Sequence, residues 1–214
     1  MPLPFTSEEF FQVFREYNEA VWPSQVLLSG LALVAVGLVF WRRQWSGVVI
    51  SSILGFLWIW SALAYHLAFF VRINPLAYGF ALIWLAGACL FVWHGAIMHR
   101  LEYAWIKGAR AYTGAVLVIF ALVIYPVWSW RAGHPYPYMP TFGLPCPTTI
   151  FTIALLAFLK RPYPRSVFIN PLLWCLIGTT AALLLGVTQD FALAIAAGAG
   201  MLFLVRVTNL SSAQ

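Results

Sequence analysis

Long apolar runs separated by short polar connections dominate the chain from residue 24 onward. A helix needs about 20 apolar residues to cross the hydrocarbon layer of a membrane, and seven runs come close to that length. Backbone groups must be paired inside lipid and the runs lack the alternation of barrel strands, so we expect helices. The predicted spans are residues 24–41, 46–70, 75–98, 111–129, 146–159, 167–186 and 188–206.

Residues 6–21 show a different pattern, that of an amphipathic helix. Thr6 and Glu9 have the spacing of a capping box, and Phe10 and Phe14 recur at a helical interval. We predict an all-α fold in which this helix lies on the bilayer surface or caps the bundle. The three parts are an interfacial helix in residues 1–23, a seven-span transmembrane bundle in 24–206 and a short tail in 207–214.

The composition favours a membrane protein and excludes a water-soluble domain. The 214 residues are 63% hydrophobic and 8% charged, whereas soluble domains carry roughly 25% charged residues. The formal net charge is +6, but the basic residues are scattered among short connections and form no cluster with interleaved aromatics. We therefore expect the lipid bilayer as a partner and no nucleic acid.

The positions of Lys and Arg predict the orientation, because these residues mark the cytoplasmic loops of membrane proteins. With seven spans, nine basic residues fall on one face and three on the other. The N-terminus is then outside and the C-terminus in the cytoplasm, whereas six spans would put one basic loop on the wrong side. The nine residues are Arg42, Arg43, Arg100, Lys107, Arg110, Lys160, Arg161, Arg165 and Arg206.

In this orientation, most of the unusual polar residues collect near the outer face. His66 lies one turn before the end of the second span, Cys146 begins the fifth and Asp190 begins the seventh. Such groups bind solutes and thiophilic metals, so we predict an outward-facing polar pocket. The candidate ligand-binding residues are Glu16, Glu19, His66, His134, Cys146 and Asp190, and the candidates for a zinc or copper ion are Glu19, His66 and Cys146.

Cys146 stands in Pro145-Cys146-Pro147, which is similar to the intramembrane cysteine-proline motifs of heavy-metal pumps. With Pro147 at the first helical position, the thiol would lie at the helix start, where free N–H groups and the helix dipole favour a thiolate. Each candidate also has a purely structural interpretation. Cys146 is then a small residue between prolines, His66 a hydrogen-bond partner for a neighbouring helix, and Asp190 a helix cap.

The connection from Trp130 to Pro145 is the longest on the outer side and is rich in prolines and aromatic residues. We expect it either to act as a lid or to lie on the lipid headgroups, with His134 at its centre. Tryptophans near mid-membrane either fill the bundle core or line a ligand cavity, namely Trp58, Trp60, Trp84 and Trp174.

Three short motifs carry a resemblance to a known family. They are Asn18-Glu19-Ala20-Val21-Trp22-Pro23, Ile73-Asn74-Pro75 and Pro145-Cys146-Pro147-Thr148. With them the chain resembles, over most of its length, a family of small bacterial multi-pass membrane proteins described as a domain of unknown function. The resemblance implies a bacterial plasma membrane and brings no activity, substrate or cofactor.

The leading functional hypothesis is a small transporter, or a membrane protein that binds a solute or metal ion, rather than an enzyme. A second is a membrane-embedded enzyme in which Cys146 is a nucleophile, or His66 and a carboxylate act as acid and base. A third is a sensor or assembly partner without catalytic activity, and a homo-oligomer stays open. The sequence has no phosphate-binding loop or hydrolase motif, and residues 188–206 hold no lysine for retinal.

Overall fold

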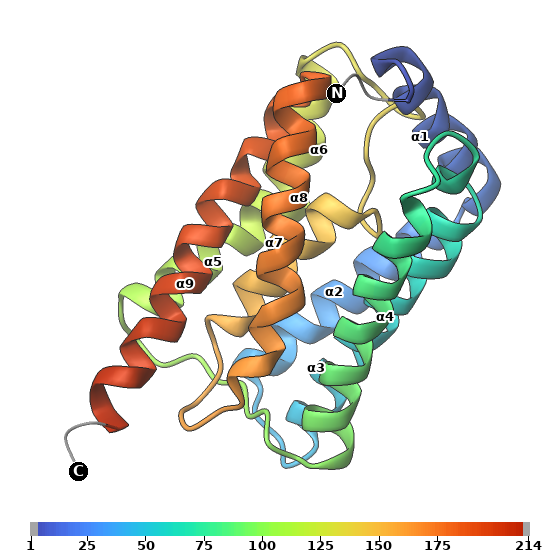
Figure 1. The fold of residues 1–214 in the computed structure, drawn as a ribbon. Coiled ribbons are helices and arrows are strands. Elements are labelled where there is room, and N and C mark those ends of the chain that lie inside the picture. Colours follow the sequence, from blue (N-terminus) through green and yellow to red (C-terminus); the bar gives the residue numbers. More distant parts are fainter. Residues whose placement is uncertain (1–3, 212–214) are drawn as a thin grey trace.

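The computed structural model describes residues 4–211, and every regular element in this part of the chain is helical, which confirms the predicted all-α class (Figure 1). The α-helices are α1 (Ser7–Val21), α2 (Ser24–Phe40), α3 (Ser46–Trp60), α4 (Ala77–Phe91), α5 (Ala109–Ile119), α6 (Tyr125–Arg131), α7 (Pro145–Leu156), α8 (Ile169–Leu185) and α9 (Ala192–Ser211). They are extended by π-helical segments η1 (Ser61–Leu67), η3 (Val92–Ile97) and η4 (Phe120–Ile124), and by 3-10 turns η2 (Phe70–Arg72), η5 (Arg165–Phe168) and η6 (Thr188–Phe191). Residues 207–211 of the predicted tail belong to α9, and 212–214 lie outside the described residues.

Five helical segments are long and apolar enough to cross a membrane, and a sixth is counted if α1 and α2, which are bent by 86°, form one span. This count, made on the described residues, does not confirm the expected seven spans. The run predicted at 146–159 forms α7, which has 12 residues. At 1.5 Å per residue this helix is about 18 Å long, short of the roughly 30 Å of a hydrocarbon core. The five segments are Ser46–Arg72, Ala77–Ile97, Ala109–Arg131, Arg165–Leu185 and Thr188–Val205.

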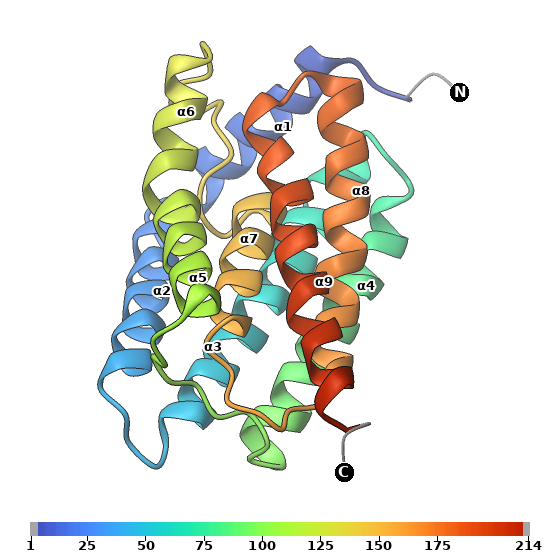
Figure 2. The same cartoon turned by 90° about the vertical axis from the view of Figure 1, so that its left-hand side faces the viewer.

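Helix α7 lies in the middle of the bundle, surrounded by the longer helices (Figure 2). All of its residues except Cys146 are buried. Trp58 Nε1 donates a hydrogen bond of 3.0 Å to Thr152 Oγ1 on this helix. At the C-terminal end of α7, Arg110 Nη2 donates a 2.7 Å hydrogen bond to the carbonyl of Leu156. This bond satisfies one of the free carbonyls at the end of the helix.

The connection that leads from α6 down to α7 is fastened to α1 by one fully buried side chain, Asn18. Its Nδ2 donates to the carbonyls of Pro137 at 2.6 Å and Met139 at 2.8 Å. Its Oδ1 accepts a 2.7 Å hydrogen bond from Thr141 Oγ1. Further along, Ser61 Oγ donates to the carbonyl of Gly143 at 2.8 Å. The connection is thus an ordered part of the bundle that runs into its interior.

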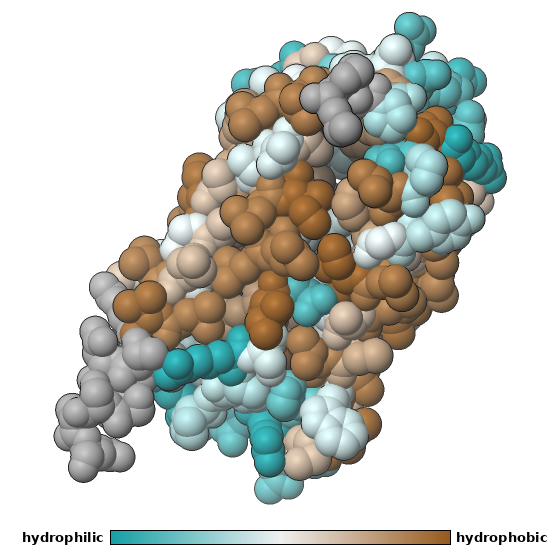
Figure 3. Space-filling model, in the orientation of Figure 1, coloured by the Kyte–Doolittle hydropathy of each residue, from teal (hydrophilic) through white to brown (hydrophobic). Residues whose placement is uncertain are grey.

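The two ends of the bundle differ in charge. Helix α1 and the connections 73–76 and 132–140 lie at one end, which we call the α1 end, and the connections 41–45, 98–108 and 157–164 lie at the other, which we call the basic end. Hydrophilic residues gather toward both ends, and hydrophobic ones cover the face between them (Figure 3). The basic end holds Arg42, Arg43, Arg100, Lys107, Arg110, Lys160, Arg161 and Arg165 in or next to its connections.

We expect Gly143→Ala to destabilise the protein. Gly143 has a φ of +101°, and an added Cβ would lie 2.4 Å from Leu28 Cδ1. Backbone strain and overpacking together should cost roughly 2 to 4 kcal/mol. Thermal unfolding of the detergent-purified protein would measure the loss. Gly30→Ala is the matched control, since nothing lies within 4 Å of the added Cβ, and equal stability of the two variants would contradict the close packing described for Gly143.

Candidate functional site

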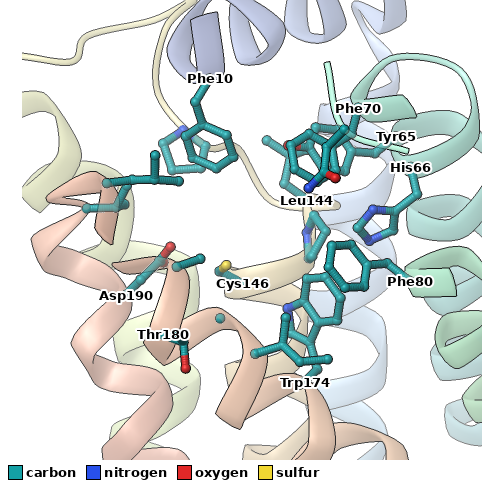
Figure 4. Close-up of a pocket in the computed structure, with 18 of the residues that line it drawn as sticks. Phe10, Tyr65, His66, Phe70, Phe80, Leu144, Cys146, Trp174, Thr180 and Asp190 are labelled. Atoms are coloured by element: carbon teal, nitrogen blue, oxygen red, sulfur yellow. The ribbon is translucent and has the colours of Figure 1, made fainter. Parts of the chain in front are cut away.

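A cavity of about 190 Å³ lies inside the α1 end of the bundle (Figure 4). Most of its wall is apolar, and much of that wall is aromatic, with side chains from α1, η1, α4, α7 and α8. Phe80 and Trp174 face each other edge to face with ring centroids 5.4 Å apart. The residues Phe5, Phe10 and Phe14 cover the cavity from the α1 side. Its shape and lining suit a small ligand with an apolar body.

The cavity reaches the side of the bundle between the start of α4 and the last turns of α8. Leu76 and Leu184, which line it, are 65% and 58% exposed. The face around α8 carries mainly hydrophobic side chains (Figure 3). A molecule that enters by this side would therefore arrive from an apolar environment.

His66 is the most unusual polar group in the cavity wall. It is 1% exposed, and neither ring nitrogen has a hydrogen-bond partner among the described residues. Its ring lies 5.1 Å from that of Trp174 and 5.9 Å from that of Phe80, measured between centroids. The wider π-helical turn of η1 buries the adjacent Tyr65 and His66 together, and such turns are frequent at functional sites. The predicted hydrogen bond from His66 to a neighbouring helix is therefore not formed among the described residues.

Asp190 reaches the same cavity from η6 and is 4% exposed. Its carboxylate accepts a hydrogen bond from the Tyr125 hydroxyl and lies close enough to the Cys146 thiol to interact with it. No ion pair among the described residues includes Asp190. Asp190 belongs to the 3-10 turn itself, whose N-cap is Val187, so its side chain serves the cavity rather than capping this turn.

Cys146 lines the cavity at the start of α7, but the helix begins one residue earlier than expected, at Pro145. Proline has no N–H group, so Pro145 and Pro147 remove two of the donors that a helix start normally offers. The expected cluster of free N–H groups beside the thiol is therefore absent from this turn. The remaining thiols lie elsewhere: Cys175 is buried and Cys89 is exposed.

The other three predicted ligand residues lie outside the cavity. Glu19 pairs with Arg15 at 3.1 Å and Glu16 with Arg72 at 3.4 Å, both on exposed surface. His134 stacks on Phe11 with ring centroids 3.7 Å apart, and its partial burial lowers the pKa of the imidazole.

The predicted metal set is not assembled. His66 and Cys146 share the cavity, but Glu19 does not line it. Among the described residues, no group of three or more His, Cys, Asp or Glu side chains could hold a metal ion. Sequence reasoning also missed Tyr125, which holds Asp190. The only signal for it was a hydroxyl close to the outer end of a predicted span.

These features define an all-helical bundle with five or six helices long and apolar enough to cross a membrane, and a cavity inside one end. The chain belongs to the family of unknown function DUF6064, which matches residues 7–214. No curated protein and no solved structure matches it.

Thiol labelling tests whether the cavity is accessible. With single-cysteine variants, we expect N-ethylmaleimide, which is small and neutral, to react with Cys146 on the order of ten-fold faster than with Cys175, because the reagent must reach a thiol before it can react with it. Cys146 lines the cavity and is partly exposed, whereas Cys175 is buried. Mass spectrometry of time points would give both rates. Equal, slow labelling would mean that the cavity is closed to reagents.

Proposed function

We propose that this protein binds a small ligand with an apolar body inside a membrane, in the course of transporting it or sensing it. The observation that carries this proposal is the cavity containing His66, whose two ring nitrogens have no partner among the described residues. A buried polar group without a partner costs about 1 to 3 kcal/mol, and a ligand that supplies the missing hydrogen bond removes this cost. The cavity therefore offers both apolar contact and a polar anchor.

We further propose that the bundle spans a bacterial plasma membrane with the basic end in the cytoplasm and the α1 end outside. The basic residues of the connections support this orientation, because they favour the cytoplasmic side. The connection 132–144 and α7 would together make one further crossing, which would complete seven passages. Non-helical backbone at membrane depth is tolerated where it is buried in protein, as it is here.

Transport is supported by the position of α7. A short helix that begins inside the bundle beside a cavity is typical of transporters, in which discontinuous helices form the substrate site. The enzyme hypothesis has less support, because no hydrogen bond among the described residues joins Cys146 to His66. A nucleophile needs such a base within reach.

Filling the cavity tests the proposal. Ala181 lines the cavity, whereas Leu183 on the same helix does not line it and is 68% exposed. The neutral photoprobe 3-phenyl-3-(trifluoromethyl)diazirine should label Trp174 and Phe80 in the wild type and in Leu183→Trp. In Ala181→Trp this labelling should fall by about ten-fold, since the indole occupies the space. Peptide mapping by mass spectrometry would locate the label.

Labelling confined to lipid-facing side chains such as Leu82 and Leu183 in all three proteins would contradict a ligand cavity. Leu82 is 68% exposed and lies outside the cavity wall, so it reports the background from the surrounding detergent or lipid.

A further inference from the structure

The cavity contains a buried carboxylate without a cation. Asp190 is 4% exposed, and among the described residues its carboxylate accepts a side-chain hydrogen bond from the Tyr125 hydroxyl, which is uncharged. No Lys or Arg in the part of the chain that the structure describes lines the cavity. Buried charges in proteins are normally paired, and an ionisable group at membrane depth marks a functional site. A cationic group on the ligand would supply the missing charge.

The aromatic wall favours the same kind of ligand. The rings of Phe70 and Phe80 stack with centroids 6.4 Å apart, and Trp174 meets Phe80 edge to face. Faces of aromatic rings carry partial negative charge and attract cations, more strongly where water is excluded. An anionic ligand would gain nothing from these ring faces, and Pro145 and Pro147 leave the start of α7 with two fewer N–H donors for it.

His66 and Asp190 lie on opposite sides of the cavity, and Cys146 lies between them in this view (Figure 4). A neutral imidazole has one N–H donor and one acceptor nitrogen. A hydroxyl group also both donates and accepts, so it can pair with either nitrogen of His66. Asp190 and His66 thus suit the two ends of one ligand whose body lies along the aromatic wall.

We propose that the cavity takes an elongated organic cation, with an ammonium group at Asp190, an apolar body along the aromatic wall and a hydroxyl group at His66. This inference rests on the proposed function, since it specifies the ligand of the same cavity. Asp190 is the counter-ion and His66 the group that recognises the distal hydroxyl.

The distribution of acidic residues supports a cation. Five of the six acidic residues are at the α1 end, namely Glu8, Glu9, Glu16, Glu19 and Asp190, and the sixth is Glu102. Most basic residues lie at the opposite end. The α1 end also holds three basic residues, Arg15, Arg72 and Arg131, so its five acidic residues leave a small excess of negative charge, which favours the approach of a cation over that of an anion.

Three probes of similar shape separate the two polar contributions. Tyramine carries both the ammonium and the hydroxyl, 2-phenylethylamine lacks the hydroxyl, and 4-propylphenol lacks the charge. Aliphatic amines, like the lysine side chain, titrate near about pH 10 and are cationic at pH 7. We expect tyramine to bind about ten-fold more tightly than 4-propylphenol and about three- to ten-fold more tightly than 2-phenylethylamine. Competition against tritiated tyramine on the purified protein would give these ratios.

Two variants assign the contributions to residues. In Asp190→Asn, which keeps an oxygen for the Tyr125 hydroxyl, the preference for tyramine over 4-propylphenol should disappear while the preference over 2-phenylethylamine remains. In His66→Phe, which keeps an aromatic ring in place, the preference for tyramine over 2-phenylethylamine should disappear while the preference over 4-propylphenol remains. Leu183→Trp is the control and should behave as the wild type, because Leu183 lies outside the cavity wall.

Equal or tighter binding of 4-propylphenol in the wild type would overturn the inference, and this comparison needs no variant to fold. Absence of tyramine binding would overturn it as well. In either case, diazirine labelling of Trp174 that is lost in Ala181→Trp would leave the proposed function standing. If the tyramine result and the diazirine labelling of Trp174 both failed, the proposed function would be contradicted together with the ligand class.

Discussion

The structure depends on pairing the backbone of a non-helical segment that enters the interior of the bundle. Buried N–H and C=O groups must find partners inside the protein. The prolines at 135, 137 and 140 have no N–H group, so the segment has fewer N–H donors that need a partner. Asn18 donates hydrogen bonds to the carbonyls of Pro137 and Met139, and Ser61 donates one to the carbonyl of Gly143. The proline-rich sequence is therefore what allows an irregular chain to lie at this depth.

The same segment explains why there is a cavity at this end of the bundle. An extended chain occupies a width of about 5 Å, whereas a helix with its side chains is about 10 Å wide. Where a longer α7 would have filled the space between η1 and α8, only residues around Leu144 and Cys146 are present. The aromatic side chains of α1, α4 and α8 close most of the remaining volume, and about 190 Å³ stays open.

The helical class follows from the sequence, because apolar runs set the helices, and depth along each run places His66, Cys146 and Asp190 at a similar level. That these three side chains line one cavity could not be predicted, because it depends on how the helices pack against one another. The short length of α7 could not be predicted from the apolar pattern, because a short helix buried in the bundle and a full membrane span are both apolar. Glu19 was predicted to line the pocket only because its depth along the membrane axis matches that of the other candidates. In the structure it pairs with Arg15, one helical turn away. Level along an axis says nothing about the direction in which a side chain points.

Helix α7 reaches from the cavity toward the basic end of the bundle. One end carries Cys146 in the cavity wall, and the other is held where Arg110 bonds to Leu156 and stacks on the rings of Tyr163 and Phe203 at 5.0 and 4.9 Å. The wall of the cavity and the basic end of the bundle are thereby joined by a single helix of 12 residues.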